Sequence, residues 1–119
     1  MGKHKIWIDD GIIRGKLFGI HDERDAKSVI TAINGLVEKE ESGRILIDMG
    51  GVEKATLEAR KVHLDNFLSN PDAFEKLALF GANTTNRVMA NFMIKAVKLE
   101  DKIKYFNSET DALNWLNEH

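Results

Sequence analysis

A short apolar run between glycines, GRILIDMGG at residues 43–51, constrains the fold more than any other stretch. Apolar runs of this length bounded by turn signals are typical of a buried strand, which we place at Arg44–Met49. Gly50 and Gly51 allow a sharp turn after the strand, and we expect a helix to begin at about Lys54. A buried strand that leads into a helix is the repeating unit of α/β proteins.

Four further apolar runs bounded by turn residues also predict strands. The first two are joined by Asp9, Asp10 and Gly11. An Asp-Gly step between such runs favours a tight antiparallel hairpin, because both residues tolerate positive φ. The predicted strands are Lys5–Asp9, Ile12–Phe18, Lys76–Phe80 and Lys102–Phe106.

Four segments expected to form helices alternate with these strands, and the first has the apolar spacing of a one-faced helix. Asp22 is the expected N-cap of the first, and Ser108 begins a capping-box pattern at the start of the last. The second and third helices are expected at about Lys54–Leu68 and Thr85–Leu99. The order β-β-α-β-α-β-α-β-α predicts a single α/β domain over residues 1–119, with a mostly parallel sheet and one antiparallel edge from the N-terminal hairpin.

Composition excludes several classes of function. The 119 residues include no cysteine, which excludes disulfides, thiolate metal ligands and cysteine nucleophiles. The formal net charge of -2 gives no basic footprint, so we expect no nucleic acid partner. No stretch is apolar enough to span a bilayer and no signal-peptide pattern is present, so we expect a cytoplasmic protein. Gly2 does not satisfy a myristoylation motif, because Ile6 stands where Ser or Thr is needed.

Motifs for phosphate, dinucleotide or nucleophile chemistry are missing, and we expect no cofactor and no catalytic residue. Asp9, Asp10 and Asp48 would form an acid pair or a magnesium site only if they converged at one sheet edge, and the first two already suit the hairpin turn. An enzyme that uses Asp48 and a histidine at the strand ends is the competing hypothesis. The histidines are scattered, which predicts surface or strand-end positions and no metal site; they are His4, His21, His63 and His119.

The third predicted helix is apolar over more than half of its circumference, which is more than one sheet face needs. Two explanations are open. Neighbouring helices cover the excess, or a patch is exposed for a partner, a second subunit or an apolar ligand. Met89 and Met93 suit an adaptable contact surface and core filling equally. The stripe expected to face the sheet is Val88, Met89, Phe92, Met93 and Ala96, and it is flanked by Ala90, Ile94 and Val97.

The order of elements and several local patterns resemble the SpoIIAA-like family, which has the fold of STAS domains (sulfate transporter and anti-sigma-factor antagonist). The resemblance covers nearly the whole chain. It implies a SpoIIAA-like α/β fold and a generally non-enzymatic protein, and some similar proteins have been related to lipid-binding folds with apolar pockets. It is carried by the opening hairpin, by ILIDMGG at Ile45–Gly51, by KLALFG at Lys76–Gly81 and by KYFNSETDALNWL at Lys104–Leu116.

The resemblance also implies a regulatory binding module. In anti-sigma-factor antagonists, a serine at the start of the helix after the central strand is phosphorylated, which switches partner binding. Thr56 and Leu57 fall near that position, so Thr56 is the candidate phosphoacceptor, although a helix-start threonine is its simpler role. We expect contact with a protein partner, a second copy of the chain, or an apolar ligand or lipid. The expected surface comprises Asp48, Gly50, Gly51, Thr56, Thr84, Thr85, Met89, Phe92, Met93 and Ile94.

Overall fold

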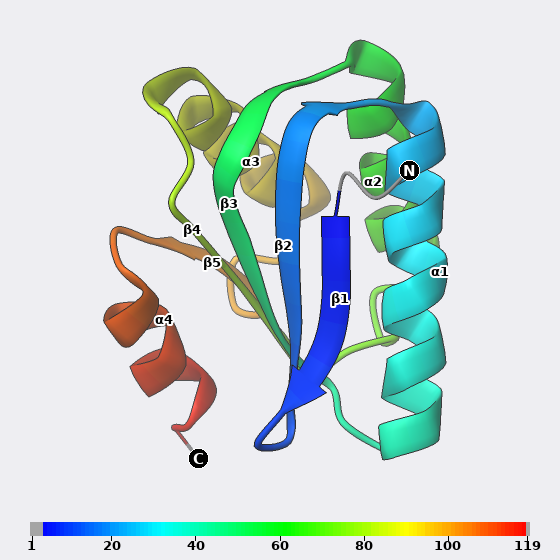
Figure 1. The fold of residues 1–119 in the computed structure, drawn as a ribbon, viewed down its shortest axis with the longest axis vertical. Coiled ribbons are helices and arrows are strands. Elements are labelled where there is room, and N and C mark those ends of the chain that lie inside the picture. Colours follow the sequence, from blue (N-terminus) through cyan, green and yellow to red (C-terminus); the bar gives the residue numbers. More distant parts are fainter. Residues whose placement is uncertain (1–3, 119) are drawn as a thin grey trace.

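The computed structural model describes residues 4–118 and shows a five-stranded mixed sheet with helices on both faces (Figure 1). Helices α1, α2 and α3 lie on one side of the sheet, and α4 lies on the other. The α/β fold class and the predicted order of elements are confirmed. The strands are β1 (His4–Asp9), β2 (Ile12–His21), β3 (Arg44–Ala55), β4 (Lys76–Phe80) and β5 (Ile103–Phe106), and the helices are α1 (Glu23–Glu40), α2 (Leu57–Ser69), α3 (Thr84–Val97) and α4 (Glu109–Leu116).

The strand order in the sheet is the same as the strand order in the chain, β1-β2-β3-β4-β5. Only β1 and β2 are antiparallel, as the Asp-Gly step predicts, and the other neighbours are parallel. Since parallel crossovers are right-handed and the order never reverses, the three crossover helices must all cover the same face. The sheet therefore lacks the reversal of strand order that forms the ligand crevice of doubly wound folds.

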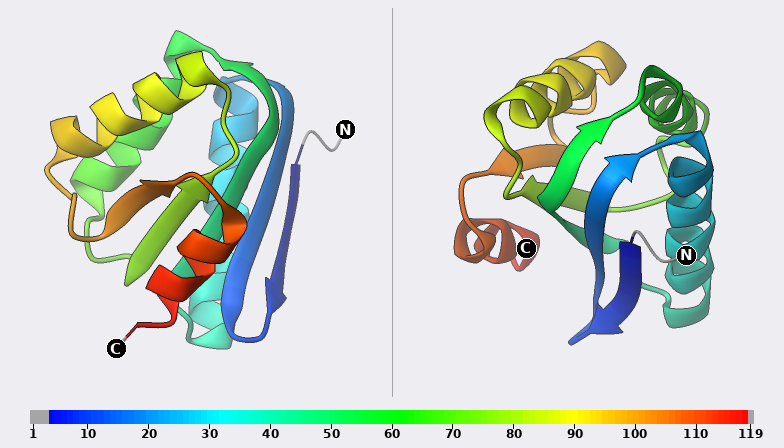
Figure 2. Two further views of the ribbon diagram at one scale, coloured as in Figure 1. Left: turned by 90° about the vertical axis from the view of Figure 1, so that its left-hand side faces the viewer. Right: turned by 45° about the horizontal axis from the view of Figure 1, so that its top comes forward.

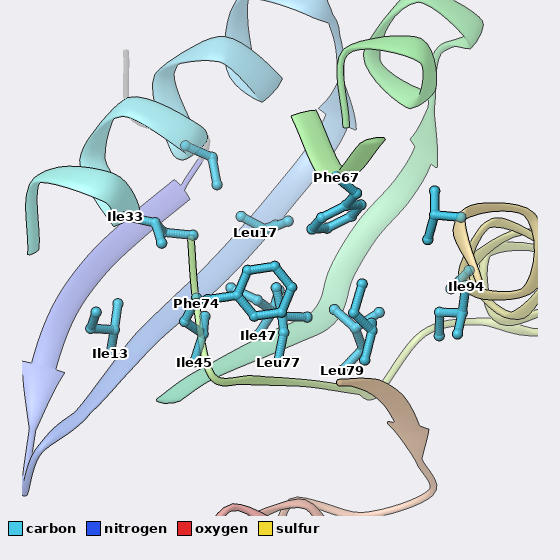
Figure 3. Packing of buried hydrophobic residues seen from close by; sticks show 14 of the residues in the cluster. Ile13, Leu17, Ile33, Ile45, Ile47, Phe67, Phe74, Leu77, Leu79 and Ile94 are labelled. Carbon is cyan, nitrogen blue, oxygen red and sulfur yellow. The ribbon is translucent and has the colours of Figure 1, made fainter. Parts of the chain in front are cut away.

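Two apolar cores lie on the two faces of the sheet, because successive side chains of a strand point to opposite sides. Ile45 and Ile47 of β3 belong to the larger core under α1, α2 and α3, and Leu46 belongs to the smaller core under α4. Figure 3 shows the larger core, in which side chains from the strands meet Ile33, Phe67 and Ile94 from the three helices. Asp48 has the same parity as Leu46, so it lies on the α4 face.

Strand β3 is longer than predicted. It runs through Gly50 and Gly51 to Ala55, and β2 extends beside it to His21, so the two glycines do not make the expected turn. Gly51 is needed for a close approach between strands. A Cβ there would lie 2.8 Å from the carbonyl oxygen of Leu17. The turn into α2 comes later, and α2 begins at Leu57 instead of about Lys54.

Short polar side chains cap the helices at their N-termini. Asp22 caps α1, and its carboxylate and that of Asp25 each accept a hydrogen bond from the other residue's amide, at 2.9 and 3.2 Å. Ser108 caps α4 by accepting a hydrogen bond from the Asp111 amide at 3.1 Å. These two predicted starts are confirmed. Such caps satisfy amides that have no partner within the helix, and each typically stabilises a protein by about 1 kcal/mol.

Candidate functional site: an apolar cavity beneath two helices

A cavity of about 850 Å³ lies on the larger-core face of the sheet, between the strands and the three crossover helices. We call it the α2–α3 cavity, because these two helices, which lie side by side in Figure 2, contribute much of its lining. Its volume falls in the range of about 300–1,000 Å³ that is usual for small-molecule sites. Apolar side chains dominate its lining, and they include Leu17, Ile45, Ile47, Val52, Leu64, Phe67, Phe74, Leu77, Leu79 and Met93.

The cavity follows from the sequences of α2 and α3. Ala59 and Phe67 are the buried residues of α2, whereas Leu57 and Leu68 are exposed, so its apolar side chains do not form one stripe that fills the sheet face. On α3, small Ala90 is among the side chains turned towards the sheet. Helices that place few bulky groups on a wide sheet leave space beneath them. The edge-to-face rings of Phe67 and Phe74, whose centroids are 5.9 Å apart, are part of the cavity lining.

Exposed apolar side chains mark where the cavity reaches the surface. Leu57 of α2 is 52% exposed, and Met89 and Phe92 of α3 are 41% and 64% exposed. All three belong to the cavity lining. A large apolar side chain that is both solvent-exposed and continuous with an apolar cavity is typical of an entrance to a binding site.

The face of α3 that contacts the sheet differs from the prediction. Ala90, Ile94 and Val97 are buried against it together with Asn86, while Val88, Met89 and Phe92 are exposed. The helix is rotated from the expected arrangement because the side chain of Asn86 is buried and hydrogen-bonded to β3. Its amide donates hydrogen bonds to the carbonyl oxygens of Val52 and Glu53 at 3.1 and 3.3 Å. The excess apolar surface of α3 is therefore left uncovered by neighbouring helices.

Two histidines meet in the cavity wall. His21 ends β2 and His63 lies in the middle of α2, and their Nε2 atoms are 3.0 Å apart with the rings stacked. Burial, and secondarily the charge of His21, lowers the pKa of His63 from 6.5 to about 4. His21 lies at a strand end as predicted, although it is buried. The prediction of surface or strand-end positions is wrong for His63, because folding brings it against His21, 42 residues away in the chain. His119 lies outside the described residues, as does Gly2.

A cation lies at the same wall. Arg60 is one helical turn before His63, and its Nη1 lies 3.5 Å from the sulfur of Met89 on α3. The Nε of Arg60 is buried and has no hydrogen-bond partner in the part of the chain that the structure describes. Lys54 and Lys61 also line the cavity, and among its described lining residues Glu58 is the single acid. The apolar cavity thus has a cationic margin.

The structure brings together only part of the predicted contact surface. Thr56, Thr85, Met89, Phe92 and Met93 line the cavity. Ile94 is 5% exposed and lies in the core beneath α3, so it does not form surface. The others are not among the lining residues; they are Asp48, Gly50, Gly51 and Thr84. Sequence reasoning missed Arg60, His63, Phe67 and Phe74, and the weak apolar periodicity of α2 was the signal that this helix does not close over the sheet.

Thr56 is the N-cap of α2, and its hydroxyl oxygen accepts a hydrogen bond from the Ala59 amide at 3.1 Å. The helix-start role predicted for this threonine is confirmed. Asp48 has a local role as well, because its Oδ1 accepts a hydrogen bond from the Gly50 amide at 2.8 Å.

The acidic residues do not converge. Asp9 and Asp10 lie at the hairpin, and Asp9 lies 3.8 Å from Arg14. In the sheet register Asp9 is opposite Ile12, whereas Asp48 is opposite Lys16, four residues further along β2. Within residues 4–118 no group of three or more histidine and acidic side chains could hold a metal ion. No helix in that range is long and apolar enough to cross a membrane.

Comparison with known proteins identifies one family. The family model described as SpoIIAA-like matches residues 12–117. No curated protein sequence matches the chain. The family match covers almost every element described above, from the start of β2 to the end of α4.

Solved structures with similar folds include three with anti-sigma-factor or SpoIIAA-like descriptions. An uncharacterized protein from Shewanella loihica with a SpoIIAA-like fold is 18% identical, with a TM-score of 0.68 over 95% of this chain and 91% of that one. The anti-sigma factor antagonist SpoIIAA in its unphosphorylated form is 12% identical, with a TM-score of 0.67 over 98% and 99% of the two chains. An anti-sigma factor antagonist from Mycobacterium paratuberculosis is 16% identical, with a TM-score of 0.68 over 97% and 93%. At these identities the likeness shows a shared fold.

Proposed function

The chain belongs to the SpoIIAA-like family, and from this premise we propose that it is a non-enzymatic binding module that takes up an apolar small molecule in the α2–α3 cavity. The family contributes the fold and the expectation of regulation through binding. The chain's own residues contribute the site. One fold hosts many functions, so the argument for the ligand rests on the cavity.

The observation that carries this proposal is the combination of volume and lining. About 850 Å³ of space is bounded mostly by apolar side chains, and it opens between exposed Leu57, Met89 and Phe92. Apolar cavities of this kind bind apolar guests in preference to water, because water finds no hydrogen-bond partners on their walls. The nearby acids and histidines do not support catalysis. Asp48 lies on the opposite face of the sheet from His21 and His63.

A fluorescent apolar probe tests the proposal. N-phenyl-1-naphthylamine is neutral and fluoresces strongly only when it leaves water, so we expect saturable fluorescence enhancement on addition to the protein. Met93→Trp places a larger side chain in the cavity and should weaken probe binding by at least ten-fold. Val88→Trp is the matched control, because Val88 is on the same helix, 59% exposed and outside the lining.

Both variants should keep the thermal unfolding midpoint close to that of the parent protein, since neither replaces a fully buried residue. A parent protein that gives no saturable enhancement would contradict the proposal. So would equal probe binding by the Met93→Trp and Val88→Trp variants.

A phosphorylation switch is the second candidate function. Thr56 supports it by its place at the N-terminus of α2, where backbone amides and the helix dipole favour an anion. The exposed side chains of α3 would then contact a protein partner or a second copy of the chain. Phosphopeptide mapping of protein purified from its native cells would support this candidate with phosphate on Thr56, and would remove it if Thr56 is always unmodified.

A further inference from the structure

We propose that the ligand of the α2–α3 cavity is a single-chain amphiphile with an anionic head group, and that Arg60 binds that head group. This inference rests on the proposed function and specifies the chemistry of the ligand. It follows from how the polar groups are distributed in a lining that is otherwise apolar.

Within residues 4–118, Arg60 has no carboxylate partner. Its Nε is buried without a hydrogen bond to any of these residues, and its Nη1 contacts the sulfur of Met89 at 3.5 Å. A guanidinium is always charged and forms its best hydrogen bonds with a carboxylate or phosphate. A thioether sulfur is only a weak acceptor. The arginine is thus held at the cavity wall with its buried Nε–H unpaired among the described residues.

The charges around Arg60 favour an anion. Lys54 of β3 and Lys61 of α2 also line the cavity, against the single carboxylate of Glu58 in the described lining. None of the three cations forms an ion pair with an acid of the chain within residues 4–118. An incoming anion would therefore be attracted by three cationic side chains that form no ion pair with the acids of the described residues.

The remainder of the cavity fits an apolar chain. On α2, positions 60, 64 and 67 follow one another along the same face, so the wall passes from Arg60 to Leu64 and then to Phe67. Phe74 and Leu77 continue the apolar lining beyond Phe67. A ligand with its head at Arg60 and its chain running towards Phe74 satisfies the guanidinium and fills the apolar space. A neutral apolar molecule would leave the buried donor of Arg60 unpaired.

Displacement of bound N-phenyl-1-naphthylamine by three twelve-carbon compounds tests this inference. The compounds are dodecanoate, dodecyl phosphate and dodecanol, which share one chain and differ in the head group. The two anions are used below their micelle-forming concentrations, and dodecanol is used below its solubility limit. We expect at least one anionic compound to displace the probe at a concentration about ten- to one-hundred-fold lower than dodecanol does, because a charged pair strengthens a hydrogen bond by about that factor. The stronger of the two anions identifies the head group as carboxylate or phosphate.

Arg60→Gln should raise the concentration at which the anions displace the probe to about that of dodecanol, and it should leave displacement by dodecanol unchanged. Arg60→Lys should restore part of the difference between the anions and dodecanol. Arg87→Gln is the matched control, since Arg87 is an exposed arginine of α3 outside the lining. Equal displacement by dodecanol and both anions, or an unchanged preference in Arg60→Gln, would overturn the head-group inference while the proposed function stands. A failure of the probe itself to bind would overturn both.

Discussion

At the scale of single residues, His63 is the side chain whose chemistry the fold changes most. It lies in α2 with its Nε2 3.0 Å from that of His21, where the N–H of one ring can donate a hydrogen bond to the unprotonated nitrogen of the other. Burial, and secondarily the charge of His21, opposes protonation and lowers the pKa of His63 from 6.5 to about 4. The hydrogen bond ties α2 to the end of β2 at the cavity wall, and it needs one unprotonated ring nitrogen as its acceptor.

The stability of the protein should therefore fall on mild acidification. In the unfolded chain His63 has a pKa near 6.5, and in the folded protein its pKa is about 4, so between these values the unfolded state binds the extra proton. The free energy of unfolding should decrease as the pH falls from about 6.5 to about 4, by at most about 3 kcal/mol from this residue. Urea unfolding at pH 7.5, 6.0, 5.0 and 4.5 measures this loss.

The variant His63→Asn keeps a polar side chain and removes the titration, so its free energy of unfolding should change less over the same pH range. His4→Asn is the control, because His4 lies on β1 outside the cavity lining. If the free energy of unfolding fell equally with pH in the parent protein and in His63→Asn, His63 would not be the residue that causes the loss of stability.

Some site residues could be predicted from sequence because their roles are local. Thr56 was expected to begin a helix, and it does so by a hydrogen bond to an amide three residues away. Arg60 and His63 could not be predicted in this way. Their significance depends on Met89 and His21, which are 29 and 42 residues distant in the chain.

At the scale of elements, α3 decides which apolar side chains become surface. Its composition predicts an excess of apolar residues, and the structure confirms that part of them is exposed. Composition does not determine the rotation of the helix, because several orientations bury a similar apolar area. The buried Asn86 selects one of them through its hydrogen bonds to β3, and this selection places Met89 and Phe92 at the cavity entrance.

Charge substitutions on α3 should report this orientation. Ile94→Glu puts a carboxylate at a position that is 5% exposed in the core, and we expect it to lower the free energy of unfolding by about 3–5 kcal/mol. Phe92→Glu, two residues away at 64% exposure, should cost less than about 1 kcal/mol. Urea unfolding of the two variants compares them directly. A larger loss for Phe92→Glu than for Ile94→Glu would show that the other face of α3 meets the sheet.

Every predicted strand and helix is present, because each is specified by short-range signals such as apolar spacing, caps and the Asp-Gly turn. The main error in the elements concerns the end of β3. The pattern at Gly50 and Gly51 predicts a turn, but the extension of β2 to His21 offers β3 more pairing partners and keeps it extended. Local patterns identify an element more reliably than its last residue, which depends on what lies beside it.

At the scale of the whole molecule, the strand order explains where the site lies. An unreversed order places α1, α2 and α3 on one face, so a single sheet surface must be covered by three helices. The apolar side chains of α2 and α3 do not fill that surface, and the α2–α3 cavity is the space that remains. Sequence patterns predict the sheet and the helices, but they do not predict how completely one covers the other.

An amphiphile that occupies the α2–α3 cavity must contact the methionine side chains of its lining. Nuclear magnetic resonance of protein labelled at the methionine methyl groups and the tryptophan indoles detects this contact. Met49, Met89 and Met93 all line the cavity, whereas Trp115 is buried in the smaller core on the opposite face of the sheet. On titration with dodecanoate and with dodecyl phosphate, we predict that at least one compound shifts the three methyl signals saturably and leaves the Trp115 indole signal unchanged. Methyl signals that stay fixed with both compounds, or that move only together with Trp115, would contradict the binding of an amphiphile in this cavity.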